Sequence, residues 1–389
     1  MKRINFDHLA CSPLLPEVRE AMIPFLSEEA GNPLSWHLFG ESAQEAVEGA
    51  RENVAHLVGA QPDEIIFTSC GSESNNFAVK GIAQAHASKG KHIIASPIEH
   101  HSVIHPLKGL QREGYDISWV DVDSTGMVDP EQIRTLLRED TILITVTSAS
   151  NEIGTLEPIK EIGSIAREKG VLFHTDAVAC AGFIPIDVQE LHVDLLSLAG
   201  NIFYGPQGTG ALYVRKGTRI FPLIAGGIQE RGLRGGTHNV PGIAGMGKAA
   251  EMADSRLDRR RDHLLDLRDR LITGVLKNIT DCTLTGHPVK RLPGHASFSI
   301  QYIEGESILI HLNSLGVAGT SGSTCSSQAL KVSHVLEAIG LDTVLAQGSL
   351  VLSLGIENTR EDISFFLEEF PPIVENLRKI SPLVHKRNP

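Results

Sequence analysis

Between about residues 60 and 215, short apolar runs alternate with longer amphipathic stretches, and this alternation constrains the fold more than any other feature. Each apolar run has the length of a buried strand, and each stretch between runs suits a helix that crosses the sheet. The pattern predicts a parallel sheet wrapped by helices. The expected strands are 65–68, 92–95, 116–120, 142–146, 171–175, 195–198 and 210–214, and the expected helices are 72–88, 102–113, 130–139 and 158–169.

The rest of the chain predicts a second, smaller α/β domain. Residues 240–278 read as one long helix, with Asn239 as its N-cap and Pro241 in its first turn. Strands are expected near 297–301 and 350–354. A chain of 389 residues is too long for one ordinary core, so we expect two domains. The large domain would comprise residues 15–255, and the small one residues 1–14 and 256–389.

Composition excludes several classes of function. A net charge of -12 and 5% aromatic residues argue against a nucleic-acid surface. No apolar run reaches the roughly 18 residues that a membrane-spanning helix needs. The five cysteines are an odd number at wide spacings, which is no disulfide framework. We therefore expect a cytoplasmic protein in a reducing compartment.

Polar residues follow several predicted strands, where open α/β sheets collect their ligands. Gly71 and Ser72 open a helix, whose free N–H groups suit a phosphate, although Ser72 could equally be a plain N-cap. Asp176 could pair with a ring N–H or cap a turn. His100 could stack on a flat ligand or be a structural histidine. Cys325 lies in a Gly/Ser-rich loop before a helix, as either a low-pKa nucleophile or an incidental thiol.

These features occur in the same order and spacing as in the cysteine desulfurases, a pyridoxal-phosphate (PLP) branch of the class V aminotransferases. The chain resembles this family over nearly its whole length. It rests on residues 31–37 (Gly-Asn-Pro-Leu-Ser-Trp-His), 67–76 (Phe-Thr-Ser-Cys-Gly-Ser-Glu-Ser-Asn-Asn), 99–100 (Glu-His), 150–155 (Ser-Asn-Glu-Ile-Gly-Thr), 203–208 (Phe-Tyr-Gly-Pro-Gln-Gly), 234–237 (Arg-Gly-Gly-Thr) and 321–325 (Ser-Gly-Ser-Thr-Cys). The resemblance implies the PLP-dependent transferase fold of type I, with a mostly parallel seven-stranded sheet in the large domain.

The resemblance also implies a cofactor pocket. Gly71 and Ser72 would hold the PLP phosphate, and His100 would stack on the ring. Asn151 would lie by the ring oxygen, and Asp176 would pair with the pyridine nitrogen.

Two further residues take their expected functions from the family. Thr237 would reach the phosphate of the neighbouring subunit, which implies a homodimer, and Cys325 would receive sulfur as a persulfide. An iron–sulfur assembly or sulfur-acceptor protein is the implied partner.

The same site carries several departures from the family pattern. The lysine that would bind PLP as a Schiff base is Ile202, and isoleucine has no amine to replace it. The arginine that would clamp the substrate carboxylate is Val351. The other changed positions are Ala179, Ala199, Asn201 and Ile356. We therefore expect a sulfur-transfer protein degenerate as a desulfurase, with any PLP bound non-covalently.

Two alternatives stay open. Cys11, Cys70 and Cys180, together with Cys325, fall at positions that the family places near the cavity. Converging thiolates suggest an iron–sulfur cluster or another soft metal that reuses the pocket, although buried thiols are often inert. The second alternative is a non-catalytic scaffold for iron–sulfur assembly.

Overall fold

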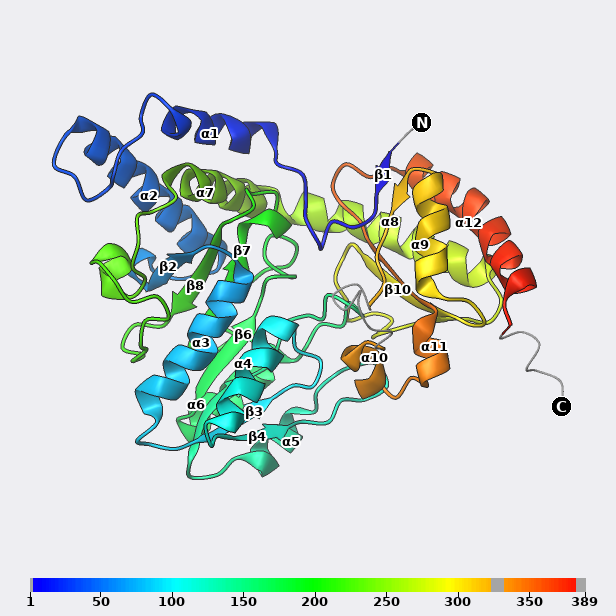
Figure 1. Ribbon diagram of the computed structural model, residues 1–389, viewed down its shortest axis with the longest axis horizontal. Helices are drawn as coiled ribbons and strands as arrows, with labels where there is room; N and C mark the ends of the chain where they lie inside the picture. The colour runs from blue at the N-terminus through cyan, green and yellow to red at the C-terminus, as the bar shows by residue number, and fades with distance from the viewer. Residues whose placement is uncertain (1–2, 323–331, 383–389) are drawn as a thin grey trace.

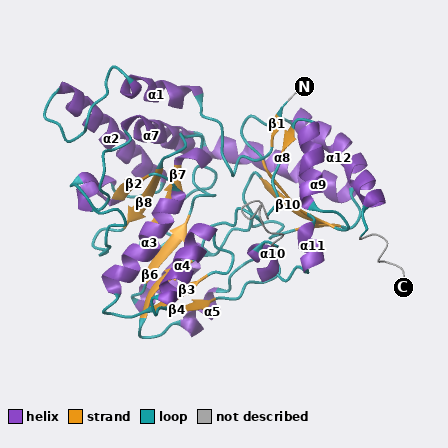
Figure 2. Cartoon of the chain, in the orientation of Figure 1, coloured by secondary structure: helices purple, strands orange, loops and turns teal. Residues whose placement is uncertain are grey.

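The computed structural model describes residues 3–322 and 332–382. Over these residues the chain forms two lobes, and helix α8 (Leu257–Asn278) runs from the larger lobe into the smaller one (Figure 1). The larger lobe is a sheet between helices, and the smaller lobe has strands of its own covered by helices (Figure 2).

The larger lobe is built on a seven-stranded sheet with the order β2-β8-β7-β6-β5-β3-β4. Strand β8 runs antiparallel to its neighbours β2 and β7, and the remaining pairs are parallel. The predicted fold class and the mostly parallel sheet are confirmed. The strands are β2 (Ile65–Thr68), β3 (His92–Ala95), β4 (Asp116–Trp119), β5 (Thr141–Thr145), β6 (Leu172–Asp176), β7 (Leu195–Ala199) and β8 (Gly210–Val214).

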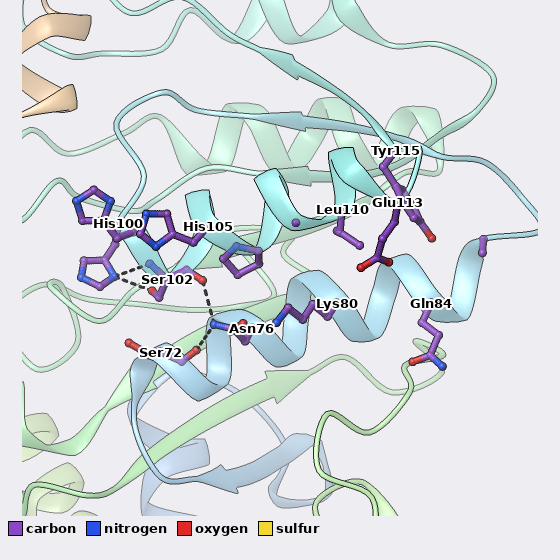
Figure 3. Close-up of a pocket in the computed structure, with 14 residues that line it drawn as sticks. Ser72, Asn76, Lys80, Gln84, His100, Ser102, His105, Leu110, Glu113 and Tyr115 are labelled. Carbon is purple, nitrogen blue, oxygen red and sulfur yellow. Dashed lines mark hydrogen bonds between the residues drawn. The ribbon is translucent and has the colours of Figure 1, made fainter.

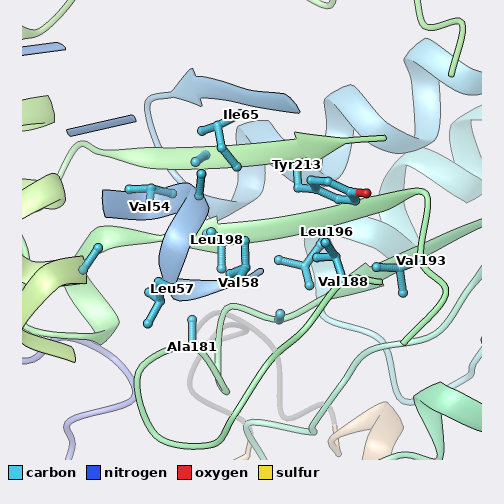
Figure 4. Close-up of a cluster of buried hydrophobic side chains, with 14 of the residues drawn as sticks. Val54, Leu57, Val58, Ile65, Ala181, Val188, Val193, Leu196, Leu198 and Tyr213 are labelled. Carbon is cyan, nitrogen blue, oxygen red and sulfur yellow. The ribbon is translucent and has the colours of Figure 1, made fainter. Parts of the chain in front are cut away.

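Both faces of this sheet are buried because alternate side chains of each strand point to opposite sides. Ile65 and Phe67 belong to one apolar cluster, part of which is shown in Figure 4, while Ile66 between them belongs to another. The first cluster lies under α2 and α7, and the second lies under α3 and α4. The helices of this lobe are α1 (Pro16–Leu26), α2 (Leu38–Leu57), α3 (Gly71–His86), α4 (His101–Arg112), α5 (Pro130–Leu136), α6 (Ile159–Lys169) and α7 (Val240–Ser255), with short 3-10 turns at Pro62–Glu64, Gly200–Ile202 and Gln229–Gly232.

The smaller lobe contains an antiparallel sheet with the order β12-β10-β9 and a core that includes Leu264, Phe298 and Phe366. The N-terminal strand β1 (Ile4–Asn5) pairs in parallel with β11 (Val317–Ala318), so both ends of the described chain belong to this lobe. Its other elements are β9 (Cys282–Leu284), β10 (His295–Ile300), β12 (Ser349–Ser353), α9 (Gly305–Ser314), α10 (His334–Ala338), α11 (Thr343–Gln347) and α12 (Arg360–Ile380).

The single long helix expected over residues 240–278 is wrong. The chain leaves helical geometry at Arg256, where φ is -119° and ψ is 12°, so α7 and α8 are separate helices. Helix α7 packs on α1 and α2 in the larger lobe, whereas α8 packs on α12 in the smaller one. The interruption at Arg256 thus separates a helix that packs in the larger lobe from one that packs in the smaller lobe. The proposed division at residues 14/15 and 255/256 stays a prediction. None of the helices in the described segments is long and apolar enough to cross a bilayer.

Candidate active site

A cavity of about 270 Å³ lies where several strands of the large sheet end. Asp176 ends β6, Ala199 ends β7, and Gly71 begins the helix that follows β2, so three neighbouring elements deliver residues to one place. The carboxyl ends of parallel strands are the usual ligand edge of such a sheet. The cavity is lined by Leu9, Ala10, Cys70, Gly71, Ser72, Asn75, His100, Ser102, Thr147, Ala149, Asn151, Asp176, Val178, Ala179, Ala199, Asn201 and Ile202.

Asp176 is the buried acid of this cavity, with 5% of its surface exposed. Its Oδ1 accepts a hydrogen bond from the Val178 N–H at 2.9 Å, and its Oδ2 accepts one from Asn75 Nδ2 at 2.6 Å. Burial raises the pKa of Asp176, while the nearby His100 and these hydrogen bonds act against that shift. A cationic N–H inside the cavity would stabilise this carboxylate. The position therefore suits the ring N–H of a protonated pyridine.

The N-terminus of α3 supplies the anion site. Its N-cap, Cys70, makes no side-chain capping bond, so first-turn N–H groups at Gly71 and Ser72 are left for another acceptor. Glu73 would repel an anion here, but its carboxylate is held by Arg234 Nε at 3.0 Å and by the Ser69 N–H at 2.7 Å. The turn can therefore accept a phosphate.

His100 is fixed at the opposite wall of the cavity. Its Nδ1 lies 2.6 Å from Ser102 Oγ, and Ser102 Oγ also accepts a hydrogen bond from Asn75 Nδ2 at 2.8 Å. The amide group of Asn75 therefore contacts Asp176 directly and His100 through the Ser102 hydroxyl. The preceding Glu99 is fully buried, and burial raises its pKa well above the ordinary value. Neither Asn75 nor Ser102 was singled out from the sequence, although Asn75 belongs to the phosphate-turn motif.

Ile202 occupies the wall where the sequence comparison expects a lysine. It is 4% exposed, and it packs in the apolar cluster that contains Ala199 and Tyr204. Its backbone oxygen accepts a hydrogen bond from Ser12 Oγ at 2.9 Å, which holds the turn against the N-terminal segment. Within the described part of the chain, no lysine or arginine lines this cavity. The cavity thus offers a ring and phosphate site without an amine.

Five of the predicted site residues, Gly71, Ser72, His100, Asn151 and Asp176, come together in the cavity. Thr237 does not line the cavity; it lies exposed in the segment between β8 and α7. Cys325 lies outside the described residues.

The alternative of a metal centre formed by Cys11, Cys70 and Cys180 finds no support among the described residues and stays a prediction. No group of three or more His, Cys, Asp or Glu side chains in residues 3–322 and 332–382 could hold a metal ion. Cys70 lines the cavity, whereas Cys11 Sγ accepts a hydrogen bond from Gln207 at 2.9 Å. Cys180 is fully buried in an apolar cluster with Ala149, and burial raises the pKa of its thiol. Of these three thiols, only that of Cys70 belongs to a residue that lines the cavity.

A larger cavity of about 810 Å³ lies between α3 and α4 and shares Ser72, His100 and Ser102 with the first (Figure 3). Asn76 joins the two helices here, because its Nδ2 donates to the Ser72 oxygen at 2.9 Å and to the Ser102 oxygen at 3.3 Å. Sequence reasoning did not identify this groove, since its lining comes from the helix faces and not from the strand ends.

Comparisons with known proteins agree with this geometry. The family described as aminotransferase class-V matches residues 4–366. The chain is similar to the cysteine desulfurase IscS of Dictyoglomus turgidum, at 52% identity over 98% of this chain and 97% of the relative. It is 50% identical to the cysteine desulfurase IscS of Methanosarcina thermophila, over 99% of this chain and 95% of the relative. The solved structure of a NifS-like protein covers 97% of this chain and is itself fully covered, with a TM-score of 0.91 at 38% identity.

Proposed function

The chain belongs to the class-V aminotransferase family, in its cysteine desulfurase branch, and from this premise we propose that it is a sulfur-transfer protein that binds PLP without a covalent link. One observation supports the proposal: the residues that we propose as contacts for the ring and phosphate of PLP line one cavity together with Ile202. PLP would supply an electron sink for bond breaking at an amino acid.

The residues of the cavity fit PLP in all but its covalent anchor. Asp176 would hold the ring N–H, His100 would cover the ring, and the α3 N-terminus at Gly71 and Ser72 would hold the phosphate. Asn75 Oδ1 is buried without a hydrogen-bond partner among the described residues, which leaves a polar group for a ligand to satisfy. Asn151 would face the ring oxygen. Nothing in this set can move a proton at the substrate α-carbon as a lysine would, so we propose that the protein is degenerate as a free-standing desulfurase.

The binding mode is tested on PLP-free protein incubated with PLP and then reduced with borohydride. We expect one PLP per chain that dialysis removes, and no pyridoxyl-lysine in the tryptic map. Asp176→Asn should raise the dissociation constant of PLP at least tenfold, because a charge-assisted hydrogen bond contributes about 1.5–3 kcal/mol. The exposed Asp262→Asn serves as the matched control. A reduced pyridoxyl-lysine in the wild-type map would refute the proposal.

We propose Cys325 as the persulfide carrier, on the family resemblance of its loop. The wild-type protein, exposed to a low-molecular-weight persulfide donor, should gain one labelled persulfide that Cys325→Ala lacks. Cys282→Ala is the control, because burial raises the pKa of Cys282 to about 12 and leaves its thiol unreactive. An undiminished label in Cys325→Ala would assign the sulfur to another thiol.

We also propose a homodimer that delivers sulfur to an acceptor or iron–sulfur assembly protein in the cytoplasm. An exposed apolar surface at the start of α2 supports the homodimer. Trp36 is 99% exposed, and Leu38 and Phe39 beside it are exposed as well. A surface of this kind is normally covered in an assembly. Sedimentation equilibrium should give twice the chain mass, and Trp36→Ser with Leu38→Ser should shift it toward the monomer.

A further inference from the structure

Apart from the groove between α3 and α4, a second cavity, of about 330 Å³, lies at the start of α8 and is lined by several positively charged side chains. Its lining consists of Arg256, Arg259, Arg260, His263 and Ile356. None of these residues lines the cavity that contains Asp176. In the described part of the chain, no carboxylate lines this second cavity. Three guanidinium groups are thus gathered around one hollow in a protein whose net charge is -12.

Arg260 forms the buried floor of this cavity. It is 3% exposed, and its Nε, Nη1 and Nη2 atoms are all buried with no hydrogen-bond partner among residues 3–322 and 332–382. Its one close contact of a charged kind is with the ring of Tyr204, whose centroid lies 5.3 Å from the guanidinium carbon. A cation–π contact leaves all five N–H donors of the guanidinium unused. The charge of Glu357 favours the charged form of Arg260, but no anion is hydrogen-bonded to the guanidinium among the described residues, although buried charges are normally paired.

The mouth of the cavity is also basic. Arg256 and Arg259 are exposed. Arg256 reaches Glu17 at 3.3 Å, and no ion pair is found for Arg259 within the described segments. The acidic side chain next in sequence to Ile356, Glu357, has its Oε2 4.0 Å from His8 Nε2.

Other arginines of the same helix are neutralised locally. Arg261 pairs with Asp258 and Asp262 at 2.9 and 3.1 Å, and Arg268 pairs with Asp269 at 2.7 Å. Arg261 and Arg268, which do not line the cavity, therefore have acidic partners, whereas no ion pair is found for Arg259 or Arg260 within the described residues. Because the two arginines of this helix for which the described residues provide no ion pair both line the cavity, the cavity is better explained as an anion-binding site than as part of a helix that is basic on all sides.

We propose that this cavity binds a small phosphate-type dianion, held on its floor by Arg260 and at its mouth by Arg259. Guanidinium groups bind tetrahedral oxyanions through paired N–H donors, and several of them converging on one point favour two negative charges over one. A volume of about 330 Å³ admits inorganic phosphate or the phosphate ester of a small metabolite. The site goes beyond the proposed PLP pocket, because the two cavities have no lining residue in common.

Titration calorimetry with inorganic phosphate on the PLP-free protein tests the proposal. To remove any binding at the α3 N-terminus, all titrations use a Ser72→Asp background, in which the new carboxylate repels phosphate there. We expect one phosphate per chain in this background. Arg260→Leu should abolish it, and Arg259→Gln should weaken it about tenfold, which corresponds to the loss of roughly 1.4 kcal/mol. Arg259 is exposed, so its variant reports on binding even where Arg260→Leu unfolds.

Arg261→Gln is the matched control, because Arg261 lies on the same helix, pairs with neighbouring aspartates and does not line the cavity. Its titration should equal that of the background protein. A parallel titration with glycerol phosphate separates the two sources: tighter binding of the ester indicates a metabolite, and tighter binding of phosphate indicates the free ion. Unchanged binding in both Arg259→Gln and Arg260→Leu, no binding at all in the background protein, or tighter binding of acetate than of either phosphate would overturn the proposal.

Discussion

Ile202 lines the cavity with its side chain packed against the smaller-lobe core, in the cluster that also contains Phe183 and Tyr204. An isoleucine fits this position better than a free lysine does, since burial of an ammonium without an acidic partner is costly. The arginine that the family resemblance implies as a substrate-carboxylate clamp is also absent from its expected position, Val351. Val351 lies in β12, almost fully buried, and exchanges backbone hydrogen bonds with Thr320 at 2.7 and 3.0 Å. The cavity therefore lacks both an amine and a carboxylate clamp.

Restoring the amine alone should not restore turnover. In Ile202→Lys we expect borohydride to fix PLP at residue 202, but cysteine-dependent alanine release should stay at least about 100-fold below that of an active desulfurase, because a missing bidentate arginine removes about 3 kcal/mol of binding. The variant should also lose about 2 kcal/mol of unfolding free energy. Ile202→Met keeps the length without the charge and is the control. Rapid alanine release by Ile202→Lys would contradict the argument.

At the scale of elements, the segment between β8 and α7 is tied to the larger lobe by one buried carboxylate. Glu230 accepts hydrogen bonds from Arg51 Nη1 and Nη2, each at 2.8 Å, and from the Phe67 N–H at 2.8 Å. His238 Nε2 lies 2.7 Å from the same carboxylate. Glu230 adopts a positive φ of 45°, a costly conformation that these four contacts maintain. The segment that carries Thr237 is thereby held against α2 and β2.

Glu230→Gln should lower the unfolding free energy by about 3 kcal/mol, since Arg51 would lose its buried partner and keep, among the described residues, only the exposed Glu48, 3.1 Å from its Nε. Burial alone would raise the pKa of Glu230, but hydrogen bonds from Arg51 and His238 hold it at about 2, below the ordinary 4.5. The stabilisation is therefore complete above pH 4.5 and is lost as the pH falls toward 2. Urea unfolding at pH 7 and at pH 4 measures both effects. The exposed Glu131→Gln, which breaks a surface pair with Arg134, should cost under about 0.5 kcal/mol.

The strands of the large sheet could be predicted from local patterns. Each is a short apolar run bounded by turn residues, and both signals can be read within a few residues of the strand. The bounds of β2, β3 and β8 agree with the prediction. The break at Arg256 could not be predicted from local patterns, since the helices on its two sides pack in different lobes: α7 against α1 and α2, and α8 against α12. Asp176 and His100 were found as strand-end residues, whereas Asn75, which links them, required knowledge of how α3 lies against β6.

At the scale of the whole molecule, the buried titratable groups divide into two sets that oppose each other. Burial raises the pKa of Glu157 to about 8 and that of Glu99 well above 4.5. Burial lowers the pKa of His174 and of His295 to about 3 and that of His8 to about 4, from an ordinary 6.5. Near pH 6 the folded protein thus keeps these acids protonated and these histidines neutral. The acids ionise when the pH rises, and the histidines become protonated when the pH falls.

Stability should therefore be greatest near pH 6 and fall on both sides. The glutamates contribute fully below pH 4.5, and their contribution is lost as the pH rises through 8, because the folded state then binds more protons than the unfolded state. The histidines contribute fully above pH 6.5, and theirs is lost as the pH falls toward 3, because the unfolded state then binds more protons. Each proton of difference changes the unfolding free energy by about 1.4 kcal/mol per pH unit.

Urea midpoints at pH 5, 6 and 8 measure this profile. Glu157→Gln, which cannot ionise, should flatten the fall from pH 6 to pH 8 and steepen the rise from pH 5 to pH 6, because the pKa of Glu157 differs between the two states over that whole range. A midpoint that rises steadily from pH 5 to pH 8 would show that the buried acids do not set the alkaline limit.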